Sequence, residues 1–192
     1  VLDMGIVGDD PGELEEALLQ ACENADAVVT SGGVSVGVAD YTKQVMAKMG
    51  DVAFWSIRMR PGRPMAFGKI RSGGDHAFLF GLPGNPVAVM VSFYFFVRDA
   101  LLHMMGALPS PLLPVRAQAA TSLSKRVGRM EFQRGVLSQN ADGNLTVRTT
   151  GEQGSGILRS MTEANGIIVL PEECETVRAG EWVDVIQLEG LT

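Results

Sequence analysis

Hydrophobic positions in the first hundred residues alternate between helical spacing and short continuous runs. Apolar residues recur three and four apart over residues 14–21, after Pro11, which suits a first helical turn. The same spacing returns over residues 41–49, before Gly50, and a longer apolar helix is predicted from Val87 to Met105. The strand-like runs are Val1–Val7, Ala27–Thr30, Val52–Met59, Met65–Ile70 and Ala77–Phe80. Such alternation predicts an α/β fold with a mostly parallel sheet covered by helices.

The pattern changes at "GALPSPLLP", residues 106–114, where three prolines favour an extended spacer. Beyond it no long amphipathic helix is apparent, and residues 140–144 resemble a hairpin turn. The predicted strands there are Phe132–Ser138, Leu145–Thr150, Gly166–Leu170 and Trp182–Leu188. We therefore predict an α/β domain over residues 1–106, a linker over 107–114, and a small all-β barrel or sandwich over 115–192.

Composition narrows the class of protein. A chain of 192 residues with 46% hydrophobic content can bury a substantial core. Its net charge of −6 argues against nucleic acid as a partner. Ser92 and Arg98 interrupt the longest apolar stretch, so we expect no membrane span. The start, Val1-Leu2-Asp3, resembles neither an initiator nor a signal segment, so we expect a fragment that begins inside a strand.

The two cysteines predict the cellular compartment. Cys22 and Cys174 lie far apart in the chain and lack the spacing of metal ligands. We interpret them as reduced thiols of a cytoplasmic protein.

A glycine-rich loop, "SGGVSVGVADYTK", follows the second predicted strand at residues 31–43. In open parallel sheets, ligands bind beyond the carboxyl ends of strands. Glycines there let the backbone approach a ligand, and exposed N–H groups beside a helix N-terminus favour an anion. A flexible turn is the alternative, because the spacing matches neither a Walker loop nor a dinucleotide fingerprint.

Three carboxylates stand before predicted helices: Asp9, Asp10 and Asp40. Each is explained without function as a helix N-cap. If the preceding strands are neighbours, Asp9 and Asp40 project at the same sheet edge, where two carboxylates beside a phosphate would suit Mg²⁺.

Positive charge gathers between Val52 and Gly74, a segment without any acidic residue. The Pro61-Gly62 turn is expected to hold Arg60 and Arg63 close together, as a clamp for phosphate or molybdate. A solvated basic loop is the alternative. "GLPGNP", residues 81–86, is a further strand-to-helix loop, and we expect all three loops to meet at one rim.

The segments "SGGVSVGVADYTK", "MRPGRPMAFGK", "GLPGNPVA", "EFQRGVL" and "TTGEQGSGIL" together resemble the molybdopterin molybdenumtransferases, known in bacteria as MoeA and in animals as the C-terminal part of gephyrin. The resemblance implies a MogA-like three-layer domain whose opening strand lies upstream of Val1, followed by a β-barrel domain. It also implies an enzyme, a transferase that inserts molybdate into adenylylated molybdopterin with release of AMP, assisted by Mg²⁺, and a homodimer.

The resemblance assigns roles to individual positions. Asp9 and Asp40 match acidic residues at the metal and molybdate site, and with Arg60 they form the expected catalytic set. The expected pterin and phosphate contacts are Ser31, Gly32, Gly33, Ser35, Gly37, Arg63, Pro83, Gly84, Asn85, Pro86 and Ser155. Ser56 departs from the family, which commonly has a lysine there.

Two other functions fit parts of the sequence. One is a non-catalytic molybdopterin-binding or scaffold module. The other is a related enzyme with the same α/β domain, such as a molybdopterin adenylyltransferase or a competence/damage-inducible-type nucleotide hydrolase. The region with Gln153-Gly154-Ser155 argues against this last class, whose members resemble only the first domain.

Overall fold

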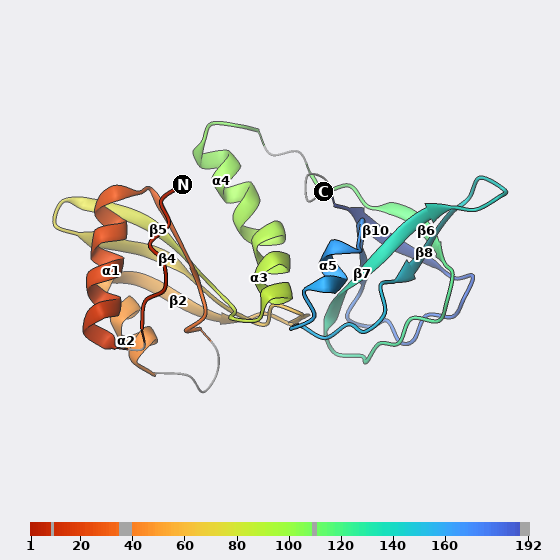
Figure 1. Ribbon diagram of the computed structural model, residues 1–192, viewed down its shortest axis with the longest axis horizontal. Helices are drawn as coiled ribbons and strands as arrows, with labels where there is room; N and C mark the ends of the chain where they lie inside the picture. Colours follow the sequence, from red (N-terminus) through yellow and green to blue (C-terminus); the bar gives the residue numbers. More distant parts are fainter. Residues whose placement is uncertain (9, 35–39, 109–110, 189–192) are drawn as a thin grey trace. The chain divides into compact units, whose positions relative to one another are not determined.

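The computed structural model describes residues 1–8, 10–34, 40–108 and 111–188, which form two compact units (Figure 1). Unit 1 contains Val1–Ile57, Gly62–Asn85 and Ser92–Gly106. Unit 2 contains Arg58–Pro61, Pro86–Val91 and Ala107–Thr192. Two short segments from the first half of the chain therefore belong to the second unit.

Unit 1 is built on a mixed four-stranded sheet, counted over the described residues, in the order β1-β5-β4-β2. β1 (Ala27–Ser31) pairs in parallel with β5 (Asp75–Leu82). β4 (Pro64–Ser72) pairs antiparallel with β5 and with β2 (Gly50–Ser56). The α/β class is confirmed, but the expected mostly parallel sheet is not formed, because β4 and β5 are joined by a tight hairpin turn rather than a helix.

Helices α1 (Pro11–Asn24) and α2 (Asp40–Met49) pack on one face of this sheet (Figure 1). Asp10 caps α1, since its Oδ1 accepts the N–H groups of Gly12 and Glu13 at 2.9 and 3.0 Å. The shared core contains Leu18, Cys22, Met46, Ile70 and Leu79.

The predicted strand Val1–Val7 is wrong. Residues 1–8 have no regular secondary structure, and residues 1–6 are exposed. An apolar run forms a strand only where a neighbouring strand accepts its hydrogen bonds, and none of the described strands pairs with this segment.

The long apolar helix is confirmed as α3 (Pro86–Ser92), a π-helical segment η1 (Phe93–Val97) and α4 (Arg98–Met104). By length and composition the helix Pro86–Met104 is apolar enough to cross a membrane, with a mean hydropathy of 1.5, and 28% of its most apolar stretch is buried. Those two criteria do not separate a core helix from a spanning one.

Unit 2 is a closed barrel. In the described residues its strands follow the order β7 (Met130–Gln139), β8 (Leu145–Thr149), β6 (Val115–Ala119), β10 (Trp182–Gln187) and β9 (Gly166–Leu170). β9 then pairs with β7 and closes the circle. The predicted all-β class is confirmed, although the sequence pattern did not indicate β6 or the short helix α5 (Arg159–Thr162).

The barrel interior is filled by apolar side chains, which include Ala117, Leu137, Val147, Ile168 and Val185. A Cβ atom at Gly135 would approach Ile168 and Val147 to 2.9 Å, so this position of β7 leaves room for its neighbours. Outside the barrel, the two-residue strand β3 (Met59–Arg60) pairs in parallel with the start of β7.

Candidate functional site

The carboxyl ends of β1 and β5 bring two predicted loops together in unit 1. Gly32 N donates to Leu82 O at 3.0 Å, and Ser31 Oγ donates to Pro83 O at 3.5 Å. Gly32 and Gly33 have φ angles of 99° and 73°, a left-handed conformation that favours glycine. The loops that contain Ser31–Gly33 and Pro83–Gly84 therefore form a shared rim at the strand ends.

The other predicted loop residues divide between the two units. Asn85 is an exposed residue of unit 1, whereas Pro86 begins α3 in unit 2. Next to Pro86, Val87 N donates to Ser155 O at 3.2 Å, which places the predicted Ser155 beside the start of this helix.

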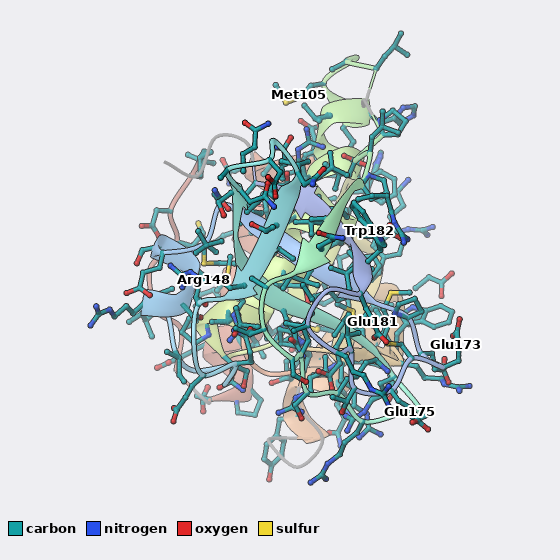
Figure 2. All side chains as sticks on the ribbon, turned by 90° about the vertical axis from the view of Figure 1, so that its right-hand side faces the viewer. Met105, Arg148, Glu173, Glu175, Glu181 and Trp182 are labelled. Carbon is teal, nitrogen blue, oxygen red and sulfur yellow. The ribbon has the colours of Figure 1, made fainter. Side chains whose placement is uncertain are left out.

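The magnesium prediction falls on positions of which the structure gives no side chain. Asp9, Ser35 and Gly37 lie outside the described residues, and of Asp40 only the backbone, at the start of α2, is described. Within the described residues no group of three or more His, Cys, Asp or Glu could hold a metal ion. Figure 2 shows Glu173 and Glu175 of unit 2 pointing outward. A metal site at Asp9 and Asp40 stays a prediction.

The two predicted clamp arginines have different partners. Arg63 belongs to unit 1, and its Nε donates to Ser56 Oγ at 3.0 Å. Arg60 belongs to unit 2, where β3 pairs it with Glu131 of β7. A clamp made by Arg60 and Arg63 stays a prediction, since the two residues belong to different units.

A cavity of about 350 Å³ lies beside β7 in unit 2. One edge of β7 is occupied by β9 over residues 131–135. The other edge pairs with β3 at residues 130–131 and with β8 from residue 135 onward, so residues 132–134 face a gap between these strands. The cavity is lined by Arg60–Pro61, Ser122–Ser124, Glu131–Arg134, Thr149, Gly151 and Gln153.

Arg134 is a buried cation in the wall of this cavity, with 1% of its surface exposed. Its guanidinium donates to neutral oxygens, Ser160 Oγ and Gly154 O, both at 3.0 Å. Burial, and secondly the positive Arg60, lower the pKa of Arg134 to about 10, so it stays charged at neutral pH. Buried charges are normally paired, yet among the described residues no carboxylate forms a salt bridge with Arg134.

The gap in the sheet is closed at the Arg134 backbone by Gln153. Gln153 Oε1 accepts the Arg134 N–H at 2.7 Å, and its Nε2 donates to Arg134 O at 3.2 Å. Gln153 thus binds both backbone groups of Arg134, and Thr150 N also donates to Arg134 O at 3.1 Å, so Arg134 is held in position.

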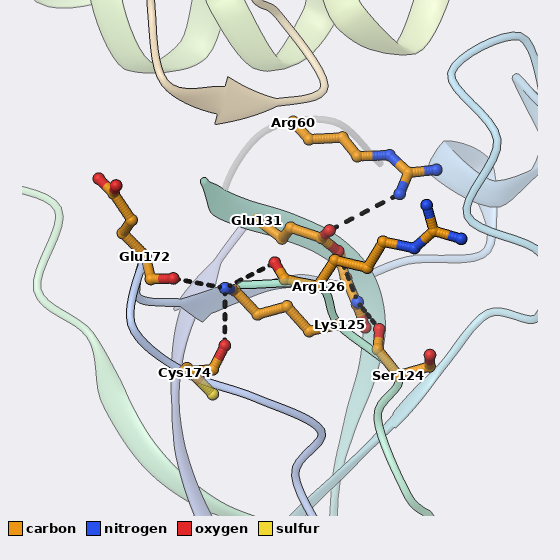
Figure 3. A network of polar contacts seen from close by, with 8 residues as sticks. Arg60, Ser124, Lys125, Arg126, Glu131, Glu172 and Cys174 are labelled. Atoms are coloured by element: carbon orange, nitrogen blue, oxygen red, sulfur yellow. Dashed lines mark hydrogen bonds and ion pairs between the residues drawn. The ribbon is translucent and has the colours of Figure 1, made fainter. Parts of the chain in front are cut away.

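Arg60 and Glu131 form a loose ion pair at the same cavity. Arg60 Nη1 lies 3.6 Å from Glu131 Oε1, and the two side chains are 55% and 9% exposed (Figure 3). Glu131 Oε2 also accepts from Gln133 Nε2 at 3.1 Å. The lining thus holds two guanidinium groups and one carboxylate, which leaves one positive charge in excess. The cavity is suited chemically to an anion.

Lys125, a neighbouring buried cation, has a structural role. Its Nζ donates to three backbone carbonyls, those of Arg126, Glu172 and Cys174, at 3.2, 3.0 and 2.8 Å (Figure 3). An ammonium group has three protons, so Lys125 keeps no donor for a ligand.

Arg134 and Glu131 were not among the residues singled out from the sequence, although "EFQRGVL" contains both. All of Glu131–Arg134 are buried, and three of these four residues are polar. Several polar residues close together in a strand that is predicted to pack in a core are unusual, and this pattern could have pointed to a polar site at Glu131–Arg134.

Comparison with known proteins matches both parts of the chain. Residues 1–103 match the family described as "Probable molybdopterin binding domain", and residues 116–188 match the "MoeA C-terminal region (domain IV)". The chain is 42% identical over 186 residues to a molybdopterin molybdenumtransferase of Haemophilus influenzae, which covers 96% of this chain and 45% of the relative. It is 31% identical over 204 residues to gephyrin of Dictyostelium discoideum, which covers 95% and 28%.

Solved structures show the same likeness. A molybdopterin biosynthesis MoeA protein from Pyrococcus horikoshii has a TM-score of 0.77 and 28% identity, over 97% of this chain and 43% of that one. A molybdenum cofactor biosynthesis protein from Pyrococcus furiosus has a TM-score of 0.72 and 29% identity, over 96% and 57%. The chain spans about half the length of the curated bacterial relatives it matches.

Proposed function

Because the chain belongs to the family of molybdopterin molybdenumtransferases, we propose that it takes part in inserting molybdate into adenylylated molybdopterin. The products of this reaction are the molybdenum cofactor and AMP. The observation that carries the proposal is Arg134, a buried guanidinium without a carboxylate partner, in a cavity that also contains Arg60.

Molybdate suits this cavity because it is a doubly charged tetrahedral oxyanion. A guanidinium group donates in a fixed fork that matches such oxygens, and charge-assisted hydrogen bonds are the strong ones. A bound oxyanion would neutralise the buried charge of Arg134 and would favour its protonated form. A phosphate group shares this chemistry, so the two anions must be compared directly.

The rim of unit 1 is suited to the second substrate, the pterin nucleotide. The backbone at Gly32, Gly33 and Gly84 is half-buried or exposed and carries no side chain, so a pterin nucleotide can approach it closely. Asp9 and Asp40 would hold Mg²⁺, which would neutralise the phosphate groups as AMP leaves. We place the protein in the cytoplasm as a homodimer, on the resemblance alone.

The test incubates the purified protein with adenylylated molybdopterin, molybdate and Mg²⁺, and measures AMP release and bound molybdenum. Arg134→Met should weaken molybdate binding about tenfold to a hundredfold, the loss expected for a charge-assisted hydrogen bond. Arg148→Met is the matched control, because Arg148 is an exposed arginine of the same unit (Figure 2).

Four results separate the candidates. AMP release that depends on molybdate and on Arg134 supports the transferase. Binding of pterin nucleotide and molybdate without AMP release favours the non-catalytic module. Equal molybdate binding by wild type, Arg134→Met and Arg148→Met would show that the cavity is not the molybdate site. Tighter binding of inorganic phosphate than of molybdate would show that the cavity binds a phosphate group of the nucleotide.

A further inference from the structure

Glu131 is a negatively charged group inside a cavity that is otherwise suited to anions. Only 7% of its surface is exposed, and it belongs to β7, directly beside the residues that face the gap. Its partner Arg60 is more than half exposed and lies at a long ion-pair distance of 3.6 Å. For comparison, Arg159 and Glu163 in the same unit approach to 2.6 Å.

A carboxylate at this place has two opposite possible effects on a bound anion. It can hold Arg60 in a productive position, in which case its removal weakens binding. It can instead compete with the ligand for Arg60 and repel it, in which case its removal strengthens binding. The two effects predict changes of opposite sign.

The contacts favour competition. Arg60 Nη1 reaches Glu131 only loosely, so little orientation is lost when the carboxylate is neutralised. Glu131 Oε2 accepts a hydrogen bond from Gln133 Nε2, and the same Nε2 donates to Ser124 O at 2.8 Å, which fixes the Gln133 side chain. The carboxylate is therefore anchored without Arg60, while Arg60 is free to turn toward a ligand.

We propose that Glu131 is an internal counter-ion that binds Arg60 in the empty cavity and releases it to an incoming tetrahedral oxyanion. This inference rests on the proposed oxyanion site and adds its regulation. Glu131 limits the affinity for any anion, so that the ligand can leave the site as well as enter it. The electrostatic penalty grows with the charge of the ligand, so it is larger for a doubly charged anion than for a singly charged one.

The experiment compares two tetrahedral oxyanions of similar shape and different charge, molybdate and perrhenate. Calorimetric titration of the purified protein gives the affinity for each. Glu131→Gln, which keeps the acceptor for Gln133, should strengthen binding of molybdate about tenfold and of singly charged perrhenate about threefold, because the free-energy change scales with ligand charge.

Matched variants separate charge from packing. Glu163→Gln removes the same charge from an ion pair outside the cavity lining and should leave both affinities unchanged. Glu131→Asp keeps the charge and should not strengthen binding. Arg60→Ala, at an exposed side chain, should weaken molybdate more than perrhenate, because loss of a cation costs a doubly charged ligand more. In Arg60→Ala, the further change Glu131→Asp, which keeps the unpaired charge but shortens its reach, should recover part of the molybdate affinity, and no recovery would count against the counter-ion role.

Failure of the inference differs from failure of the proposed function. If wild type binds molybdate through Arg134 but Glu131→Gln binds it equally or more weakly, the counter-ion role is wrong and the oxyanion site stands. If Arg134→Met binds both anions like wild type, the oxyanion site is wrong and the counter-ion role is wrong with it.

Discussion

Arg134 shows how a single residue can oppose the stability of the fold that contains it. Its pKa is lowered to about 10 mainly by burial, which means that folding disfavours its charged form. The sign follows from linkage: a depressed folded-state pKa for a base costs stability at every pH below about 10. The cost disappears only as pH rises from there toward the ordinary pKa of arginine, above which both states are neutral. At neutral pH, Arg134 is retained at the expense of stability.

We therefore predict that Arg134→Met folds with a melting temperature equal to or above that of ligand-free wild type. Met fills a similar volume without a buried charge, and replacing buried ionic groups by apolar ones is often neutral or stabilising. Thermal unfolding with and without molybdate measures both effects, since ligand binding stabilises the native state by mass action. Wild type should gain stability with molybdate and the variant should not. A large loss of stability in the ligand-free variant would show that Arg134 is a structural residue.

The sequence predicted part of the candidate site at this scale. The strand-end glycines are local signals, and the Ser31–Gly33 loop meets the Pro83–Gly84 loop as expected. The pairing of Arg60 with Glu131, and the closeness of Arg60 to Arg134, depend on the two-residue strand β3 joining a distant strand. No periodic pattern is readable in two residues, so sequence reasoning related Arg60 only to its near neighbour Arg63.

At the scale of elements, periodicity predicted the long segments well. α1, α2 and the α3–η1–α4 helix lie where apolar spacing placed them, and α1 buries Leu18, Ala21 and Cys22 at that spacing. The errors concern pairing, which a sequence does not display. Val1–Val7 has a strand-like composition but no partner, and the hairpin between β4 and β5 makes the sheet mixed. β6 was missed although Val115–Ala119 alternates apolar and polar residues as a strand does, because it directly follows a proline-rich segment and two of its three apolar residues are alanines, which are depleted in strands.

The buried helix boundary at Ser92 carries a second prediction. Ser92 is fully buried where α3 passes into η1, and its Oγ has no hydrogen-bond partner within the described structure. A buried unsatisfied hydroxyl costs about 1–3 kcal/mol. Ser92→Ala should therefore raise the free energy of unfolding by about 1 kcal/mol, or the melting temperature by about 2–4 °C.

Denaturant unfolding of Ser92→Ala measures this change. Thr30→Val is a matched variant, because Thr30 Oγ1 is likewise buried without a partner and Val has nearly the same shape. If both variants are destabilised, hidden polar partners, such as a bound ligand or water, satisfy these hydroxyls in solution.

The start of α2 carries a third prediction, on the predicted metal site. Asp40 is the first residue of this helix. Asn caps a helix about as well as Asp, so the melting temperature of Asp40→Asn should equal that of wild type under either role of Asp40. Mg²⁺-dependent AMP release should nevertheless fall by most of its value, since an amide is a poor ligand for Mg²⁺. Full turnover in the variant would exclude Asp40 from the metal site.

At the scale of the whole molecule, unit 2 is assembled from three separate stretches of chain. β3 pairs with β7, and Met130 N donates to Arg58 O at 3.0 Å. Arg58 also forms an ion pair with Glu172, and Val87 N donates to Ser155 O. A simple division at residue 106 would separate the barrel strands from these two segments.

This construction leads to the last prediction. We propose that limited proteolysis cuts first within residues 106–114, where the proline-rich sequence favours an extended spacer. The two fragments should nevertheless stay together in native gel filtration and separate only in denaturant, because the N-terminal fragment supplies Arg58–Pro61 and Pro86–Val91 to unit 2. For the same reason residues 107–192 expressed alone should lose anion binding, since Arg60 is absent and the gap beside β7 is open. Two fragments that part under native conditions, with a barrel fragment that still binds molybdate, would show that the barrel is complete without its two inserted segments.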